Sequence, residues 1–240
     1  MDNLGLSLVC NKRLRLNEAV PMSSSCSHPA SKRVLDVVGA SLLLAGLAPV
    51  LGLVAACIWL DDGRPLLFTQ TRAGCQGDPF RIFKFRTLTH EPDDPARPSA
   101  HTTRIGGLLR RWALDELPQL WNVLRGEMSL VGPRPLLMRY LPYYTEEEQL
   151  RHQVPPGITG WAQIHGRNRL DWDTRLAYDV WYVRHRSLVL DAKILWKTVQ
   201  IVFLDPTAGD ISERVQGDLD EEREPRQTQL EFLPGQNATR

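Results

Sequence analysis

The chain has 240 residues, of which 42% are hydrophobic and 24% are charged, as is usual for a globular protein. Its 29 basic and 28 acidic residues leave a formal net charge of +1, so overall charge points to no particular class of partner. The four cysteines, Cys10, Cys26, Cys57 and Cys75, form no CxxC pair and no Cys/His ligand spacing. This pattern predicts reduced thiols in a cytosolic setting, with neither a zinc site nor a disulfide framework.

The N-terminal segment is polar and irregular and includes the serine-rich stretch 23–27. No apolar core follows the start directly, so the segment is not typical of a signal peptide. Residues 1–30 are therefore predicted to be a disordered arm.

A long apolar segment follows. From Val37 to Leu60, 24 consecutive residues are apolar, small or proline, and none is charged. As a helix this segment would be about 36 Å long at roughly 1.5 Å per residue, which is enough to span a bilayer. Lys32 and Arg33 precede it, and on charge bias a spanning helix would have its N-terminus in the cytoplasm. The alternative is a buried core helix of a soluble protein.

Pro49 lies in the middle of this apolar segment, where it removes one helical hydrogen bond and favours a kink. The chain downstream is rich in arginine and aromatic residues and lacks disulfide spacing, which is typical of the cytoplasm. A helix that enters the membrane, bends at Ala48-Pro49 and returns to the same face satisfies both observations. Periodicity does not separate it from a kinked spanning helix. We expect residues 31–62 to be a re-entrant membrane anchor.

Residues 63–204 are predicted to form a mainly helical catalytic domain with a few short strands, so the fold class is α+β. Strict alternation predicts a strand over 80–86, and a second short apolar run predicts a strand over 66–70. Helices are predicted over 105–112, 115–124, 143–152, 171–184 and 187–204, with 127–135 irregular. The polar tail of mixed charge, residues 205–240, is predicted to be disordered.

Two adjacent carboxylates, Asp115 and Glu116, stand at the predicted start of a helix, just after Arg110. Neighbouring helical side chains diverge, so the two carboxylates cannot share a proton and would have different functions. A helix N-terminus and nearby arginines favour ionised Asp115. Such a carboxylate can attack phosphorus, or bind Mg²⁺ together with substrate phosphates. Taken alone, the pair is more typical of a helix cap.

Several cations accompany the carboxylates. Arg134 lies between two prolines, which hold its backbone rigid and suit it to clamp a phosphate. With Lys84, Arg86 and Arg110 it would provide the charges that a diphosphate bridged by Mg²⁺ requires. The basic run 104–111 has no nucleic-acid motif around it, so we expect no nucleic acid as a partner.

The sequence from about Lys32 to Leu204 resembles the bacterial sugar transferases, also called monotopic phosphoglycosyl transferases. Several motifs match in order and spacing, which makes the resemblance highly specific. They are Lys32-Arg33-Val34-Leu35-Asp36, Lys84-Phe85-Arg86-Thr87, the run Asp115–Pro135, Pro156–Gln163 with Gly166-Arg167-Asn168, and Asp179-Val180-Trp181-Tyr182-Val183.

The resemblance implies transfer of a sugar-1-phosphate from a UDP-sugar to a polyprenyl (undecaprenyl) phosphate, at the start of surface polysaccharide or glycoconjugate synthesis. Asp115 matches the nucleophile, which would release UMP and leave a covalent phosphosugar for the lipid phosphate to attack. Glu116 matches the second carboxylate, with a supporting role in binding Mg²⁺ or activating the lipid phosphate. Cationic positions around the phosphates and nucleotide are matched by Arg110, Arg134 and Arg167, and by Lys84 and Arg86 on a strand. The family also implies a re-entrant helix-break-helix in the bacterial inner membrane, with the catalytic domain on the cytoplasmic face.

The sequence departs from the family at two positions: Ala48 replaces a frequent serine at the break, and Pro155 replaces a frequent basic residue. It also lacks the extra spanning helices of longer members and so resembles a short form. An inactive scaffold is one alternative, opposed by the intact Asp115–Glu116 pair. An unrelated membrane-tethered binding protein is another, but it leaves the motifs unexplained. The sequence does not decide the sugar, the polymer, or whether the chain forms a homo-oligomer.

Overall fold

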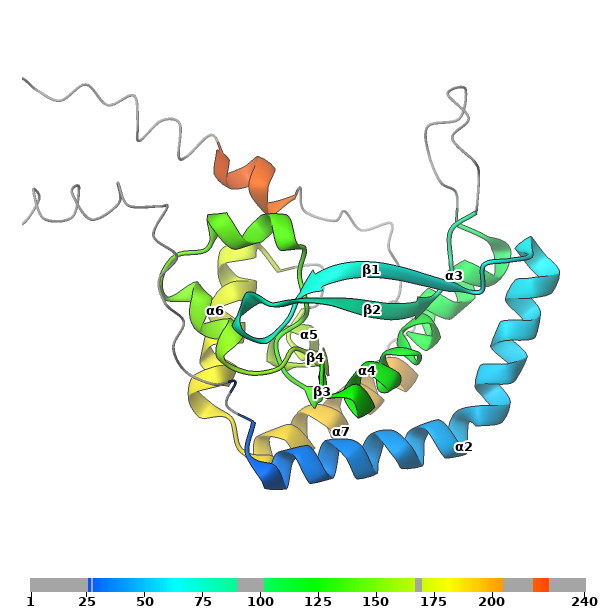
Figure 1. Cartoon of the computed structure of the whole chain (residues 1–240), viewed down its shortest axis with the longest axis horizontal. Coiled ribbons are helices and arrows are strands. Elements are labelled where there is room, and N and C mark those ends of the chain that lie inside the picture. Colours follow the sequence, from blue (N-terminus) through cyan, green and yellow to red (C-terminus); the bar gives the residue numbers. More distant parts are fainter. Residues whose placement is uncertain (1–25, 27, 90–101, 167–169, 205–217, 225–240) are drawn as a thin grey trace, which may run out of the picture.

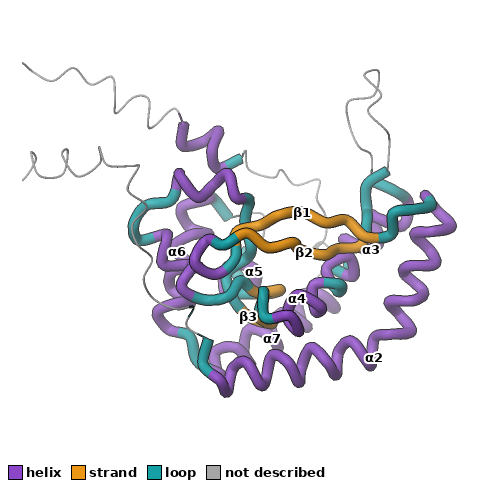
Figure 2. The backbone as a smooth tube through the Cα atoms, viewed as in Figure 1, coloured by secondary structure: helices purple, strands orange, loops and turns teal. Residues whose placement is uncertain are grey.

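The computed structural model describes residues 26, 28–89, 102–166, 170–204 and 218–224 (Figure 1). In this part of the chain the predicted α+β class is confirmed: helices dominate and the strands are short (Figure 2). The helices are α2 (Ala30–Asp62), α3 (Arg104–Arg111), α4 (Gln119–Arg125), α5 (Trp161–Ile164), α6 (Trp172–His185) and α7 (Leu188–Leu204). The strands are β1 (Leu67–Ala73), β2 (Pro79–Phe85), β3 (Ser129–Val131) and β4 (Gly157–Thr159). Short 3-10 turns are η1 (Cys75–Gly77), η2 (Leu114–Glu116), η3 (Met138–Tyr143) and η4 (Glu148–Gln153).

Helix α2 contains 33 residues and is long and apolar enough to cross a membrane. Only 11% of its most apolar window is buried, so the alternative of a soluble core helix does not fit. Pro49 lies inside α2, and the helical conformation continues through it without a break. Figure 1 shows that the two halves of α2 nevertheless run in different directions. A proline inside a helix is a usual cause of such a bend.

Both ends of α2 are attached to the rest of the molecule. Near its start, the Asp36 carboxylate accepts a hydrogen bond from the Leu130 amide in β3. At its end, Asp62 forms an ion pair with Arg86, and Asp61 accepts a hydrogen bond from the Ile105 amide. The bend therefore brings the two ends of one apolar helix back to the same folded unit (Figure 1).

The four strands form two small sheets, each of two strands. Strands β1 and β2 form an antiparallel hairpin with a register from Leu67 opposite Phe85 to Ala73 opposite Pro79. Strands β3 and β4 are parallel. A Cβ at Gly157 of β4 would lie 2.0 Å from the amide nitrogen of Gly132, the residue after β3. The close approach of the two backbones therefore requires glycine at position 157. The prediction that 127–135 is irregular was wrong at β3, because its partner strand is distant in the sequence.

The main hydrophobic core lies between the hairpin, α4, β3 and the last two helices. It includes Ile82 of β2, Val123 of α4, Val131 of β3 and Ile194 of α7, all nearly inaccessible to solvent. Ala40 of α2 is also fully buried there, so only the first half of α2 contributes to this core. Its second half packs separately against β2 and α3 through Val54 and Ile58.

Part of the region predicted to be a disordered tail is described, and it packs against η3, η4 and α6. Residues 219–224 are helical, and Leu219 is fully buried in a cluster with Tyr140 and Trp172. Arg223 forms ion pairs with Glu148 and Asp173. These contacts join the C-terminal segment to η3, η4 and α6.

One prediction about the cysteines was wrong. Cys26 and Cys75 form a disulfide, with their Cα atoms 6.0 Å apart, whereas Cys57 is a free thiol and Cys10 lies outside the described residues. The disulfide places Cys26, which precedes α2, against the turn between β1 and β2. The spacing of the cysteines in the sequence does not predict this long-range contact.

Candidate active site

The Asp115–Glu116 pair lies on η2, a turn between α3 and α4. Ala113 has a positive φ of 52° and redirects the chain after α3, and the Leu117 amide then donates to the Leu114 carbonyl. Pro118, at the N-cap of α4, has no amide hydrogen with which to continue this bonding pattern. The predicted single helix over 115–124 was therefore wrong. The carboxylates belong to a separate turn and do not cap a long helix.

Glu116 is held by two cations. One of its carboxylate oxygens, Oε1, accepts Lys84 Nζ at 2.7 Å and Arg134 Nη2 at 2.8 Å. Burial acts to raise the pKa of Glu116, but Arg134 and Lys84 outweigh burial and hold the pKa well below its usual range. Glu116 is thus a permanent anion that joins β2 to the Pro133-Arg134-Pro135 turn.

Asp115 has a different environment, although it is the adjacent residue. Its side chain is buried, and no hydrogen bond or ion pair to its carboxylate occurs within the described part of the chain. Burial and the charge of Glu116 raise the pKa of Asp115 to about 6, against the influence of Lys84, Arg134 and Arg110. At neutral pH the carboxylate is therefore ionised but poorly compensated, with its lone pairs available to an incoming group.

The other predicted cations divide into two groups. Arg110 Nε donates to Thr87 Oγ1 at 2.7 Å, and its charge acts on Asp115, so it lies beside the carboxylates. Arg86 instead donates to Asp62 Oδ2 and to the carbonyls of Asp62 and Gly63. It fixes the end of α2 and does not contact the carboxylate pair. Arg167 lies outside the described residues.

The sequence reasoning missed a buried ion pair behind Arg134. Arg151 donates to Asp179 Oδ2 from Nε at 3.1 Å and from Nη2 at 2.8 Å. Arg151 Nη2 also donates to the carbonyl of Arg134 at 2.6 Å, so the Arg151–Asp179 ion pair holds the backbone of Arg134 in place. Asp179 opens one of the matching motifs, which was the available signal. Nothing in the spacing identified Arg151.

Asn122 is a second residue that sequence reasoning missed. Its side chain is fully buried on α4, and its Oδ1 accepts the Phe83 amide of β2 at 3.2 Å. Its Nδ2 donates to the Arg81 carbonyl and to Glu127, both at 2.7 Å. These bonds lock β2 against α4 and so place Lys84 next to Glu116.

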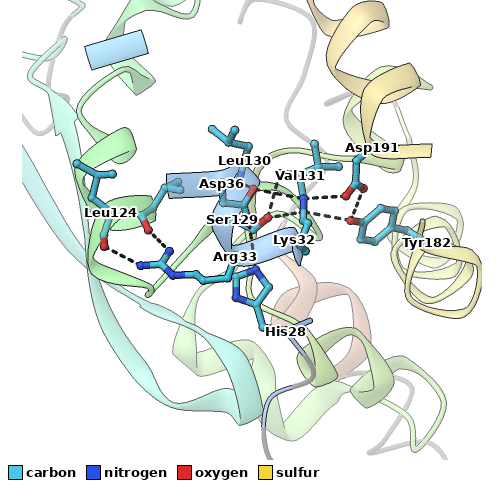
Figure 3. A network of polar contacts seen from close by, with 11 residues as sticks. His28, Lys32, Arg33, Asp36, Leu124, Ser129, Leu130, Val131, Tyr182 and Asp191 are labelled. Atoms are coloured by element: carbon cyan, nitrogen blue, oxygen red, sulfur yellow. Dashed lines mark hydrogen bonds and ion pairs between the residues drawn. The ribbon is translucent and has the colours of Figure 1, made fainter. Parts of the chain in front are cut away.

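A polar network attaches the start of α2 to β3, α4, α6 and α7 (Figure 3). Lys32 Nζ lies 2.8 Å from Asp191 Oδ2 and 3.3 Å from Asp36 Oδ1, and the Tyr182 hydroxyl donates to Asp191 Oδ1 at 2.7 Å. Arg33 donates to two carbonyls at the end of α4. The Lys-Arg-Val-Leu-Asp motif therefore attaches α2 to β3, α4 and α7.

The donor set around Asp115 is compatible with Mg²⁺ when a substrate is bound. Among the described residues, no group of three or more His, Cys, Asp or Glu side chains is arranged to hold a metal ion. Mg²⁺, however, commonly uses one or two carboxylates and completes its shell with water and substrate phosphates. Asp115 has uncommitted oxygens, and Glu116 has one oxygen outside the Lys84–Arg134 contacts.

Comparisons with known proteins agree with the resemblance. The family model described as bacterial sugar transferase matches residues 27–205. The uncharacterized sugar transferase EpsL of Bacillus subtilis is 48% identical over 176 residues, which cover 72% of this chain and 87% of EpsL. The UDP-glucose:undecaprenyl-phosphate glucose-1-phosphate transferase of Caulobacter vibrioides is 46% identical over 182 residues, which cover 70% of this chain and 68% of that protein.

The protein of the same name from Escherichia coli K12 is 38% identical over 219 residues, covering 83% of this chain but only 47% of the E. coli protein. The family match spans α2, both sheets, the carboxylate turn and α7. The chain therefore belongs to the bacterial sugar transferase family.

Proposed function

We propose that the protein transfers a sugar-1-phosphate from a UDP-sugar to a polyprenyl phosphate and releases UMP. The observation that carries the proposal is Asp115, a buried and poorly compensated carboxylate next to Lys84, Arg134 and Arg110. An ionised carboxylate among cations can attack a phosphorus atom whose negative oxygens those cations neutralise. The names of the Caulobacter and E. coli relatives, both glucose-1-phosphate transferases, support the same reaction.

In the first step, an Asp115 oxygen attacks the phosphorus that carries the sugar. A new bond forms between that oxygen and phosphorus, the bond to the bridging oxygen breaks, and UMP leaves with the electron pair. In the second step, a lipid phosphate oxygen attacks the same phosphorus, and the Asp115 carboxylate leaves. The products are a polyprenyl-diphosphate sugar and the free enzyme.

The cations around the pair would stabilise these charges. Lys84 and Arg134, held in position by Glu116, would bind non-bridging oxygens of the diphosphate. Arg110, anchored on Thr87, would neutralise charge near Asp115. A Mg²⁺ ion held by Asp115 and Glu116 would supply Lewis-acid stabilisation of phosphate charge. Arg151 would keep the Arg134 backbone in place during both steps.

We further propose that α2 is re-entrant and that the catalytic region lies on the cytoplasmic face of the inner membrane. Both ends of α2 are bonded to the same folded unit, through Asp36 and through Asp62. A straight spanning helix would place these ends on opposite sides of a bilayer. Exposed apolar residues of α7, including Trp196 and Phe203, would add contact with the membrane interface.

Replacing Asp115 with asparagine tests the reaction. Membranes containing the full chain are incubated with Mg²⁺, polyprenyl phosphate and a panel of UDP-sugars, and released UMP is measured. We expect Asp115→Asn to abolish UMP release and trapping of labelled phosphosugar on the protein, because the amide is not a nucleophile. Asp78→Asn, which changes an exposed aspartate, is the matched control and should behave as wild type.

Normal turnover by Asp115→Asn would disprove the nucleophile assignment. No UMP release by the wild-type protein with any donor would favour an inactive membrane scaffold. The donor that gives the highest rate would also identify the sugar.

A further inference from the structure

Arg72, near the end of β1, is a further cation that interacts with Arg134. It lies opposite Phe80 in the hairpin, and its Nη2 donates to Gln70 Oε1 at 2.6 Å. The amide of the next residue, Ala73, donates to the Leu136 carbonyl at 3.0 Å. This backbone bond brings the end of β1 against the segment that follows Arg134.

The polar groups around Arg134 have unused hydrogen-bonding capacity. The Nε of Arg72 is buried and has no acceptor within the described part of the chain. The hydroxyl of Tyr144, a residue that is only 6% exposed, is similarly buried without a partner. Leaving a buried donor without an acceptor is unfavourable, so a group rich in acceptor oxygens would stabilise this region.

The cations of this region also act on one another. Burial lowers the pKa of Arg72, and the charge of Arg134 lowers it further, while Glu116 acts in the opposite direction. Burial and Arg134 also lower the pKa of Arg175, a residue of α6 whose guanidinium lies 4.7 Å from the Trp172 ring centroid. Arg72 and Arg175 therefore both lie close enough to Arg134 for repulsion.

Nearby carboxylates offset part of this repulsion, because Glu116 raises the pKa of Arg134, and Asp115 and Asp179 act in the same direction. The Glu116 oxygen Oε1 already accepts Lys84 and Arg134. Asp179 offsets part of the charge, but one of its oxygens already accepts two bonds from Arg151. An anionic ligand at Arg72 would relieve the repulsion, because guanidinium groups bind phosphate oxygens through paired, charge-assisted hydrogen bonds.

Arg134 interacts both with the carboxylate pair and with Arg72. It contacts Glu116 next to the nucleophile, and it interacts with Arg72 and Arg175 on other elements. A diphosphate has two phosphate groups, of which only the one bearing the sugar reacts with Asp115. The second phosphate group, which does not react, would then lie beside Arg134 and Arg72.

We propose that Arg72, together with Arg134, forms a subsite for the phosphate group of the nucleotide that leaves as the nucleoside monophosphate. This inference rests on the proposed function and adds a binding residue to it. Arg72 would hold the non-reacting phosphate during the first step and stabilise its growing negative charge as the bridging bond breaks. The same contacts bind free UMP after the step.

Binding of UMP to the full chain in detergent tests this subsite without requiring turnover. Isothermal calorimetry compares wild type, Arg72→Gln and the matched control Arg81→Gln, which changes an exposed arginine of the same hairpin. We expect Arg72→Gln to weaken UMP binding by about ten- to a hundredfold, the range for a lost charge-assisted contact. Arg81→Gln should bind UMP as wild type does. In steady-state assays, Arg72→Gln should raise KM for the UDP-sugar and leave KM for the polyprenyl phosphate unchanged.

Equal UMP affinity for Arg72→Gln and wild type would overturn the subsite, as would an equal loss in Arg81→Gln. A raised KM for polyprenyl phosphate with unchanged UMP affinity would assign Arg72 to the lipid phosphate and refute our assignment.

If Arg72→Gln does not fold, Arg72→Lys decides the question. Lysine keeps the charge but cannot form paired bonds, so UMP should bind several-fold more weakly, and wild-type affinity would contradict the proposal. Wild-type protein that binds UMP through Arg72 but has no turnover would disprove the proposed function and leave the subsite intact.

Discussion

At the scale of single residues, the main feature is the contrast between two adjacent carboxylates. Glu116 has two cationic partners, whereas Asp115 is buried without a bonded cation in the described structure. Their pKa values therefore move in opposite directions: that of Glu116 falls and that of Asp115 rises to about 6. Groups whose environments separate their pKa values in this way commonly have different roles in a reaction.

This contrast predicts how the first chemical step depends on pH. A raised pKa means that Asp115 is protonated, and not nucleophilic, below about pH 6. Single-turnover UMP release should therefore increase about tenfold per pH unit below pH 6 and level off above it. Rapid-quench measurements from pH 5 to 8 give this profile.

Glu116 adds no inflection in this range, because its pKa is well below the usual value. The control is the thermal midpoint at each pH, which should show that the protein stays folded. A rate that is independent of pH from 5 to 8 would contradict the assignment of Asp115 as the titrating nucleophile.

At the scale of elements, α2 combines an exposed apolar surface with polar attachments at both ends. Lys32, Arg33 and Asp36 attach its start to α4, β3 and α7. The ion pair between Asp62 and Arg86 attaches its end to the residue that follows β2. Breaking a largely buried ion pair costs about 3–5 kcal/mol, so these attachments strongly oppose separation of the two ends.

These attachments predict the topology of α2 in the membrane. In a chain whose native cysteines are replaced by serine, single cysteines at exposed Ser31 and Thr69 should both react with a membrane-impermeant maleimide from the same side. Inverted and right-side-out vesicles distinguish the two sides. A cysteine at Leu43, in the exposed apolar part of α2, serves as the control and should stay unlabelled in both.

Labelling of Ser31→Cys and Thr69→Cys from opposite sides would establish a spanning helix and rule out the re-entrant arrangement. Labelling of both cysteines only from the outer side would contradict the cytoplasmic placement.

At the scale of the whole molecule, the segment around Leu219 stabilises the catalytic region from outside the family match, which ends at residue 205. Leu219 is fully buried against Tyr140, Trp172 and Leu176. The Tyr140 hydroxyl donates to Asp218 at 2.6 Å. The segment thus joins η3 to α6, the helix that carries Asp179.

Leu219→Ala should destabilise the protein by about 2–5 kcal/mol through the cavity it leaves. The thermal midpoint in detergent should fall by roughly 4–20 °C, at about 2–4 °C per kcal/mol. Leu204→Ala, at a position that is 76% exposed, is the matched control and should change stability by less than about 0.5 kcal/mol. UMP release well below the midpoint should remain near wild type. An unchanged midpoint for Leu219→Ala would mean that the C-terminal segment does not support the fold.

Local sequence was sufficient for the features that depend on neighbouring residues. Strict alternation predicted β2, the apolar run predicted α2, and the helix signals around residues 171–204 predicted α6 and α7 within one to two residues. The motifs around Asp115 and Arg134 led to the family, which the match over residues 27–205 confirms. Each of these signals is local because helix and strand periodicity arise within one element.

The tertiary structure alone decided which distant groups meet. It joined Lys84, Glu116 and Arg134, turned Arg86 away to Asp62, and formed the Cys26–Cys75 disulfide that the spacing did not predict. It also gave Asp115 and Glu116 different environments, although they are neighbours. The physical reason is that burial, ion pairing and pKa depend on groups brought together by chain folding, and their separation in sequence does not encode those distances.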